Sequence, residues 1–237
     1  MKEETIGILG GMGPEATADL FRKIIKNTEA TKDQDHLRVL IDNNPKIPDR
    51  TAAMLASGES PLPMIMETAR NLERAGADFI AIPCVSAHYF IRELRERISI
   101  PVISIIDEVA REITRSHPSI RRVGLIATTG TVRTRLFQNR LREVGVDVLV
   151  PSAQDQEELV MSAIYGIKAG SISPENREKI LKASKALIEK GAQGIIGGCT
   201  EVPLVVQGGD MEVHFFDSLD ILALAAIHRA KGGLVGE

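Results

Sequence analysis

Cysteine is scarce in this sequence, since 237 residues contain only two, Cys84 and Cys199. A closed zinc site needs four ligands, and neither cysteine has a second cysteine or a histidine at the usual ligand spacing. His88 follows Cys84 by four residues, as on a helix, but one such pair completes at most half of a site. The sequence therefore predicts no metal site and leaves two interpretations of the thiols, catalysis or inert burial.

Long apolar runs are missing too. No segment approaches the roughly 20 apolar residues that span a bilayer. The apolar run in MKEETIGILGG is too short for a signal peptide. We expect a cytoplasmic protein without membrane association, in which thiols stay reduced and a structural disulfide is disfavoured.

An excess of charge of either sign is also absent. The formal net charge of −3 provides no general attraction for nucleic acid, so no nucleic-acid partner is expected. Arginines do gather in one region, but apolar residues and acids are interleaved among them, which favours a solvated helix face. These arginines stand at positions 121, 122, 133, 135, 140 and 142.

The glycine-rich loop GGMGPEA (10–16) lacks the motifs of nucleotide sites. Aligning Gly11 and Gly13 with G-x-G-x-x-G puts Ala16 at the third glycine, and the G-x-x-x-x-G-K spacing is absent. We therefore predict no cofactor. Two interpretations of the loop stay open, because its backbone N–H groups can approach a small anion such as a carboxylate, while glycine also suits a tight turn.

Short apolar runs alternate with helical patterns along the whole chain, which predicts a parallel α/β architecture. The expected strands cover 5–9, 37–42, 78–83, 101–105, 122–128, 146–150, 193–198 and 212–216. The expected helices cover 14–27, 62–75, 88–98, 107–116, 132–143, 155–165, 174–190 and 218–230.

The chain repeats itself. LERAGADFIAIPC (72–84) and LIEKGAQGIIGGC (187–199) share a charged helix end, Gly-Ala, an apolar strand and cysteine. TIGILGGMGP (5–14) likewise matches RVGLIATTGT (122–131) at nearly the same offset. We predict two pseudo-symmetric α/β domains, each a short parallel sheet flanked by helices. The first covers 1–105, with a C-terminal helix at 217–237 packing on it, and the second covers 106–216.

Both cysteines follow a strand at corresponding places of the two halves, where open parallel sheets bind ligands. We therefore expect an active site in the cleft between the domains, with the thiols on opposite sides. One thiolate then removes a proton from a carbon and the other thiol returns a proton to the opposite face. The helix-like segment after each cysteine is expected to lower the thiol pKa toward neutral. Burial of a small hydrophobe is the alternative for either cysteine alone.

Two cations are placed where they could bind a carboxylated substrate. Arg50 lies in the polar loop NPKIPDRT (44–51) after the second strand, and Lys168 lies in YGIKAG (165–170) after a helix of the other half. Taken singly, each residue is interpreted more readily as a surface charge than as a ligand.

Several segments together resemble the aspartate racemase branch of the aspartate/glutamate (Asp/Glu/hydantoin) racemase family. They span about residues 5–217 and include GILGGMGPEAT, DQDH (33–36), NPKIPDRT, GADFIAIPC, ATTGTV, AIYGIKAG and GCTEVP. The resemblance implies two pseudo-symmetric α/β domains, a homodimer and cofactor-independent racemisation with Cys84 and Cys199 as the two bases. It implies that Arg50 and Lys168 bind the carboxylates of the substrate. The other substrate contacts it implies are Met12, Asn43, Ser86, Thr128, Thr131 and Thr200.

Two positions bear on the substrate. Glu201 in GCTE resembles the aspartate branch, since glutamate racemases usually carry histidine there. Val85 departs from the Cys-Asn-Thr that family members usually have, so an amide that would bind the substrate or orient the site is replaced by an apolar group. We expect aspartate as the substrate, with glutamate or a broader range as alternatives.

Three other functions stay open. The scaffold also supports decarboxylases and isomerases of dicarboxylates that rely chiefly on one cysteine, although Cys199 argues against them. A non-catalytic binder of an acidic amino acid would account for Val85. A thiol redox switch is the third, but no flanking residue favours it.

Overall fold

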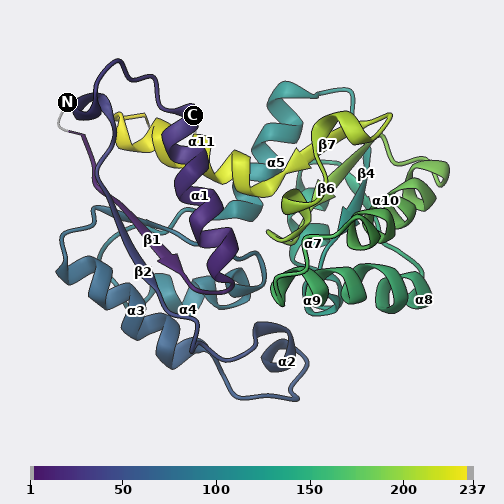
Figure 1. The fold of residues 1–237 in the computed structure, drawn as a ribbon, viewed down its shortest axis with the longest axis horizontal. Coiled ribbons are helices and arrows are strands. Elements are labelled where there is room, and N and C mark those ends of the chain that lie inside the picture. The colour runs from purple at the N-terminus through teal and green to yellow at the C-terminus, as the bar shows by residue number, and fades with distance from the viewer. Residues whose placement is uncertain (1–2, 234–237) are drawn as a thin grey trace. The chain divides into compact units, whose positions relative to one another are not determined.

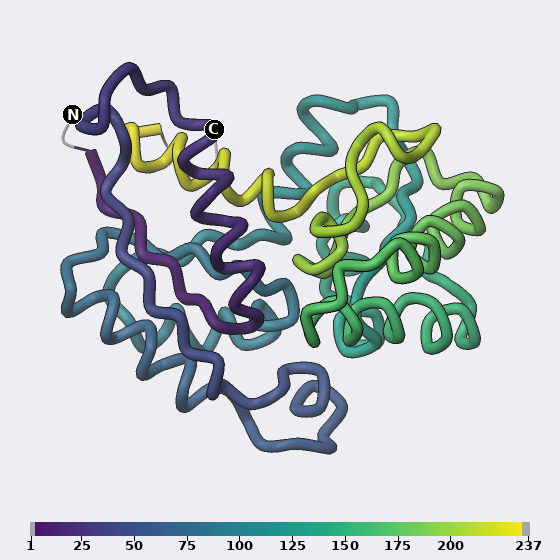
Figure 2. The backbone as a smooth tube through the Cα atoms, viewed as in Figure 1, coloured from purple at the N-terminus to yellow at the C-terminus, as the bar shows by residue number. Residues whose placement is uncertain are grey.

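The computed structural model describes residues 3–233 of the chain, which forms two compact units. Of these residues, 3–108 and 219–233 belong to the first unit, and Val109–Ser218 form the second. The chain passes from the first unit into the second within α5 (Ile105–Ser116). It returns at the start of α11 (Ser218–Ala230), as the colour ramp of Figure 2 shows.

The first unit contains a parallel sheet in the order β2-β1-β3. β1 is the central strand, and all five of its residues are buried, since IGILG contains no polar side chain. Gly7 is required in this strand, since a Cβ there would come within 2.8 Å of the Cβ of Ala77. The three strands are β1 (Ile6–Gly10), β2 (Val39–Asn43) and β3 (Phe79–Ala81).

Helices α1 and α3 pack against β1 (Figure 1). Each buries one face, because apolar residues recur three or four positions apart along both helices. Pro14 is the first residue of α1, where a missing N–H is harmless. The helices that lie within this unit are α1 (Pro14–Asn27), α2 (Arg50–Met54), α3 (Leu62–Arg74) and α4 (Ile91–Arg95), to which α11 adds its residues from Leu219 on.

The second unit contains a parallel sheet in the order β5-β4-β6-β7. Its strands are β4 (Arg122–Ile126), β5 (Asp147–Leu149), β6 (Gly194–Gly197) and β7 (His214–Asp217). Its helices include α6 (Thr129–Arg133), α7 (Leu136–Glu143), α8 (Ala153–Asp155), α9 (Ser162–Lys168) and α10 (Pro174–Glu189).

The two sheets share one strand order. In each, the first strand is central and the next two strands lie on either side of it. β7 adds a fourth strand beside β6, whereas the corresponding place beside β3 holds a single bridge between Ile80 and Val102. The expected strand over 101–105 was therefore wrong. Pro101 has no N–H to donate, and the chain enters α5 at Ile105, with Ser104 Oγ accepting a hydrogen bond from the N–H of Asp107.

Three expected helices differ in form. The segment over 88–98 is a 3₁₀ helix (Ser86–Phe90) followed by α4. The segment over 132–143 is two helices, α6 and α7, because Arg135 between them adopts a left-handed conformation with φ of 58°. The segment over 155–165 runs from α8 to α9 through a π-helix (Gln156–Met161).

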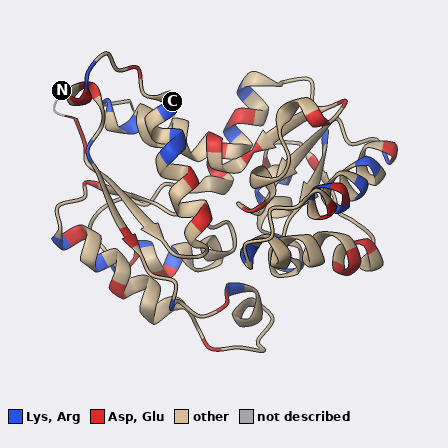
Figure 3. Cartoon of the chain, viewed as in Figure 1, with Lys and Arg blue, Asp and Glu red and all other residues tan. Residues whose placement is uncertain are grey.

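Basic and acidic residues are intermixed along the helices of both units, as Figure 3 shows. Within residues 3–233, no helix is both long enough and apolar enough to cross a membrane.

Candidate active site

Cys84 lies in a tight turn just beyond the carboxyl end of β3. Its N–H donates to the carbonyl of Ile82 over 2.8 Å, and its side chain is buried. The carbonyl of Cys84 accepts a hydrogen bond from Nδ1 of His88 over 2.9 Å, while Nε2 of the same ring accepts from the N–H of Ile105 over 3.1 Å. His88 therefore connects the turn of Cys84 to the first residue of α5.

Burial keeps the His88 ring neutral, since it lowers the pKa of His88 to about 4. A neutral ring with one donor and one acceptor nitrogen matches its two backbone partners. Both nitrogens are thus occupied by hydrogen bonds.

The loop between β1 and α1 is held by its own backbone and by Thr17. Gly11 has φ of 95°, and a Cβ there would overlap the backbone of Asn44. Thr17 Oγ1 accepts from the N–H of Gly11 over 2.9 Å and donates to the carbonyl of Gly13 over 3.1 Å. Met12, at the centre of this loop, is buried in the same apolar cluster as Cys84.

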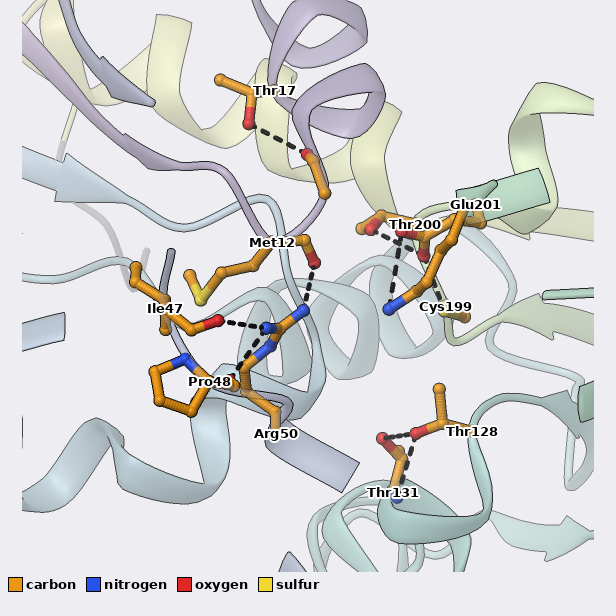
Figure 4. Close-up of polar contacts among 12 residues, drawn as sticks. Met12, Thr17, Ile47, Pro48, Arg50, Thr128, Thr131, Cys199, Thr200 and Glu201 are labelled. Atoms are coloured by element: carbon orange, nitrogen blue, oxygen red, sulfur yellow. Dashed lines mark hydrogen bonds and ion pairs between the residues drawn. The ribbon is translucent and has the colours of Figure 1, made fainter. Parts of the chain in front are cut away.

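Arg50 is a buried cation at the first position of α2 (Figure 4). It donates three hydrogen bonds to the carbonyls of Ile47, Pro48 and Met12, over 3.1, 3.0 and 3.0 Å. Its Nε is buried without a hydrogen-bond partner, and no carboxylate of the described residues pairs with it. A guanidinium with an unused donor and no anion can accept a carboxylate.

Three further predicted residues belong to the first unit. Asn43 is the last residue of β2 and is exposed beside Gly10 of the central strand. Val85 and Ser86 directly follow Cys84 and are buried, with Ser86 as the first residue of the 3₁₀ helix. This 3₁₀ helix contacts α2, the helix of Arg50.

In the second unit, Thr128 caps α6, the helix that follows β4, and contacts Thr131 within it. The N–H of Thr131 donates to Oγ1 of Thr128 over 3.3 Å, and the two hydroxyl oxygens are 3.1 Å apart. Both side chains are buried. This is the loop that corresponds to GGMGP of the first unit.

Cys199 follows β6 and forms a buried polar cluster with its neighbours (Figure 4). Its Sγ donates to Oε2 of Glu201 over 2.8 Å, and Oγ1 of Thr200 lies 3.5 Å from the same oxygen. Lys168 is the last residue of α9, and its Nζ lies 3.8 Å from Oε1 of Glu201. The four side chains are thus linked through one carboxylate.

The pKa of Cys199 is raised well above its usual value, first by burial and then by the negative charge of Glu201. Lys168 opposes this shift but does not outweigh it. The expected lowering of the pKa was wrong for Cys199, because burial and the charge of Glu201 outweigh any effect of the single 3₁₀ turn (Val202–Leu204) that follows it. Cys199 therefore holds its proton in this state.

The π-helix (Gln156–Met161) holds the loop of Thr128 through hydrogen bonds to Ala127 and Thr129. Gln156 Nε2 donates to the carbonyl of Ala127 over 2.9 Å and lies 3.3 Å from Oγ1 of Thr129. Glu157 accepts a hydrogen bond from Thr129 Oγ1 over 2.8 Å, and Met161 Sδ accepts one from the backbone N–H of Thr129 over 3.2 Å. The same helical segment continues through α9 to Lys168.

The structure thus groups the predicted residues within each unit. Three important residues were not predicted, namely Thr17, His88 in its role as a connector, and Gln156. The i+4 spacing of His88 from Cys84 was the available signal, because it allows the ring to reach the Cys84 carbonyl. Within residues 3–233, no three histidine, cysteine, aspartate or glutamate side chains are grouped closely enough to hold a metal ion.

Comparison with known proteins identifies relatives along nearly the whole chain. The sequence model of the Asp/Glu/hydantoin racemase family matches residues 9–226. The broad specificity amino-acid racemase RacX of Bacillus subtilis (strain 168) is 28% identical over 228 residues, which cover 94% of this chain and 96% of that protein. A glutamate racemase of Aquifex pyrophilus is 30% identical over 68% of this chain and 61% of its own length.

Two solved structures are similar over comparable lengths. Picrophilus torridus aspartate racemase has a TM-score of 0.86 and 29% identity, with 96% of this chain and 94% of that chain covered. An aspartate racemase homologue from Pyrococcus horikoshii OT3 has a TM-score of 0.77 and 30% identity, with 96% and 99% covered.

Proposed function

Because this chain belongs to the Asp/Glu/hydantoin racemase family, we propose that it interconverts the enantiomers of an acidic amino acid with Cys84 and Cys199 as its two acid/base groups. The observation that carries the proposal is the equivalent placement of the two cysteines. Each follows the third strand of a sheet with the same strand order, and each is buried with its thiol free of any disulfide.

Racemisation by two thiols conserves protons without a cofactor. One cysteine, as thiolate, takes the proton from the α-carbon and becomes a thiol, leaving a carbanion. The other cysteine, as thiol, gives its proton to the opposite face of that carbon and becomes a thiolate. After one turnover the two cysteines have exchanged protonation states, and the reverse reaction begins from there.

The raised pKa of Cys199 supports an assignment of these roles in the resting state. Cys199 is a thiol that donates to Glu201, so it is ready to act as the acid. Cys84 then acts first as the base. Glu201 accepts the thiol hydrogen bond in the free enzyme, and the cationic amino group of a substrate would offset its charge.

Arg50 and Lys168 supply the cations that a dicarboxylic substrate requires. Arg50 is supported by its burial, its three backbone carbonyl contacts and its unpartnered Nε, since a carboxylate would satisfy this donor. Lys168 is supported by its proximity to Glu201, which fixes the amine near Cys199. Thr128, Thr131, Thr200 and Ser86 supply hydroxyls at the ends of the strands.

Val85 widens the choice of substrate. It is buried directly beside Cys84, where an apolar side chain makes no hydrogen bond to a substrate. We propose aspartate as the main substrate, with glutamate also accepted. The similar proteins include aspartate, glutamate and broad specificity racemases, which agrees with this range.

The test is proton NMR of D- and L-aspartate and of D- and L-glutamate with the protein in D₂O and no added cofactor. We expect the α-proton signal to disappear while the opposite enantiomer forms, as measured on a chiral column. Cys84→Ser and Cys199→Ser should each abolish racemisation. Ala69→Ser is the matched control, because Ala69 is buried in the same apolar cluster as Cys84 but lies on α3.

Two results would contradict the proposal. A fully active single cysteine variant would exclude the two-thiol mechanism. Binding of aspartate with all four α-proton signals intact would instead indicate a non-catalytic binder, and release of carbon dioxide would indicate a decarboxylase.

A further inference from the structure

A cavity of about 440 Å³ opens in the second unit beside the edge strand β5. Its lining includes Arg122, Arg135, Gln138, Arg142, Val148 and Leu149. Gln138 and Arg142 are four positions apart on one face of α7, which packs on β5, and Arg135 directly precedes this helix. Three of the six arginines expected on a solvated helix face thus line one cavity.

The three guanidinium groups have no partner. Neither Arg122, Arg135 nor Arg142 makes a side-chain hydrogen bond or an ion pair with the described residues. Asp147 lines the same cavity, but it too is without an ion pair there. Like charges held at one site repel one another unless an anion is bound. The chain has more acids than bases, so the lack of a partner is local.

The backbone at Arg135 is strained, with φ of 58° and ψ of 32°. Glycine or asparagine is favoured in this left-handed conformation, and residues with longer side chains adopt it rarely. Non-glycine residues in this region are concentrated at functional sites, where the strained backbone is part of the function. Here the strained position is the one that carries a guanidinium into the cavity.

Gln138 adds an unsatisfied acceptor to the same lining. Its Nε2 donates to the carbonyl of Val132 over 3.2 Å, which fixes the orientation of the amide. Its Oε1 is buried and has no hydrogen-bond partner. A ligand group with a hydroxyl or amino hydrogen would satisfy this oxygen.

We propose that this cavity binds a nucleoside di- or triphosphate. Arg135 and Arg142 suit adjacent phosphates, because arginine binds phosphate oxygens in a bidentate manner. Gln138 Oε1 can accept from a hydroxyl or amino group, and Val148 offers an apolar surface to a ring. The volume is that of a small-molecule site.

The site is separate from the candidate active site. Arg122 is the first residue of β4, whereas Thr128 and Cys199 follow the carboxyl ends of β4 and β6. Nucleotide binding here needs no glycine-rich loop, so the lack of a nucleotide motif at residues 10–16 does not argue against it. The inference does not depend on the proposed racemase activity.

The test is isothermal titration calorimetry of the full chain with ATP, ADP, AMP, adenosine and inorganic triphosphate at low salt. We expect affinity to fall from ATP through ADP to AMP, with no binding of adenosine. Inorganic triphosphate should compete with ATP but bind more weakly. Arg142→Gln should weaken ATP binding by about tenfold or more, since it removes a charged hydrogen-bond donor.

Two further variants separate binding from folding and from diffuse charge. Arg133→Gln removes the same charge from α6, outside the cavity lining, and should bind ATP as the unaltered protein does. Arg135→Gly removes a guanidinium but relieves the left-handed strain, so it should lose ATP affinity while its thermal unfolding temperature is unchanged or higher.

Three results would overturn the proposal. The first is the absence of binding by any of the phosphates at millimolar concentration. The second is equal loss of affinity in Arg133→Gln and Arg142→Gln, which would indicate diffuse attraction. The third is tighter binding of a single-stranded oligonucleotide than of ATP, which would indicate a nucleic-acid surface instead.

Discussion

The thiol of Cys199 donates a hydrogen bond to the carboxylate of Glu201, with 2.8 Å between Sγ and Oε2. Both side chains are buried, so the carboxylate charge acts on the thiol with little screening by solvent. Burial and this charge together raise the pKa of Cys199 well above its usual value, so the thiol keeps its proton. The two cysteines of the repeat are therefore equivalent in position but not in environment.

Glu201→Gln should lower the pKa of Cys199, because it removes the charge that opposes ionisation of the thiol. The measurement is the pH titration of thiolate absorbance in the ultraviolet, made in a Cys84→Ser background so that one thiol is observed. We expect the midpoint to move to lower pH. Glu212→Gln, at an exposed site of the same unit, should leave it in place. An unchanged midpoint in Glu201→Gln would show that burial alone controls this thiol.

Much of the fold could be predicted from the sequence. The order of strands and helices follows from apolar periodicity, and the repeat of Gly-Ala, strand and cysteine places Cys84 and Cys199 at equivalent strand ends. The family resemblance is confirmed by the match over residues 9–226.

Other features depend on tertiary contacts and could not be predicted. The break at Arg135 and the π-helix at Gln156–Met161 have no glycine or proline to mark them. The pKa of Cys199 depends on the burial of Glu201, which local sequence does not indicate. By contrast, Pro101 was an available signal against the strand expected over 101–105, since a residue without an N–H cannot donate to a neighbouring strand.

His88 should make the folded protein less stable in mild acid. Burial lowers its pKa to about 4 from the usual 6.5, and it outweighs the opposing hydrogen bonds to the backbone at Cys84 and Ile103. Between these pH values the unfolded chain binds a proton that the folded chain does not, so the free energy of unfolding falls as pH drops from 6.5 to 4. The full loss is about 3 kcal/mol.

Urea unfolding across this pH range measures that loss. His88→Gln should have a lower free energy of unfolding at neutral pH, because it disturbs the contacts to Cys84 and Ile105. Its dependence on pH should nevertheless be flatter than that of the unaltered protein. His36→Gln, which changes an exposed histidine of the same unit, should keep the original slope. Equal slopes in all three proteins would mean that His88 is not buried in the neutral form.

Two glycines with similar backbone angles should differ sharply on substitution by alanine. Gly11 and Gly76 have φ of 95° and 91°, so both substitutions introduce left-handed strain of about 1 kcal/mol. A Cβ at Gly76 meets no atom within 4 Å, whereas a Cβ at Gly11 overlaps the backbone of Asn44. Gly11→Ala should therefore lower the free energy of unfolding several times more than Gly76→Ala in urea titrations. Similar losses would contradict the packing of the Met12 loop against Asn44.

Gln156 should act on substrate binding through the loop that it holds. Gln156→Glu keeps the shape of the side chain but removes the N–H that donates to the carbonyl of Ala127, and it sets a carboxylate against that oxygen. Thr128 and Thr131 would then lose their position. We expect KM to rise by about tenfold or more while kcat changes less, since the change acts on substrate contacts rather than on the cysteines.

Gln154→Glu is the matched control for this variant, because Gln154 is exposed on the same helical segment. It should leave KM unchanged, although it sets a carboxylate beside Glu158, which Gln154 contacts over 3.1 Å. A fall in kcat with constant KM in Gln156→Glu would place the effect on proton transfer instead. Equal changes of KM in both variants would show that added charge on this segment, and not the contact with Ala127, controls binding.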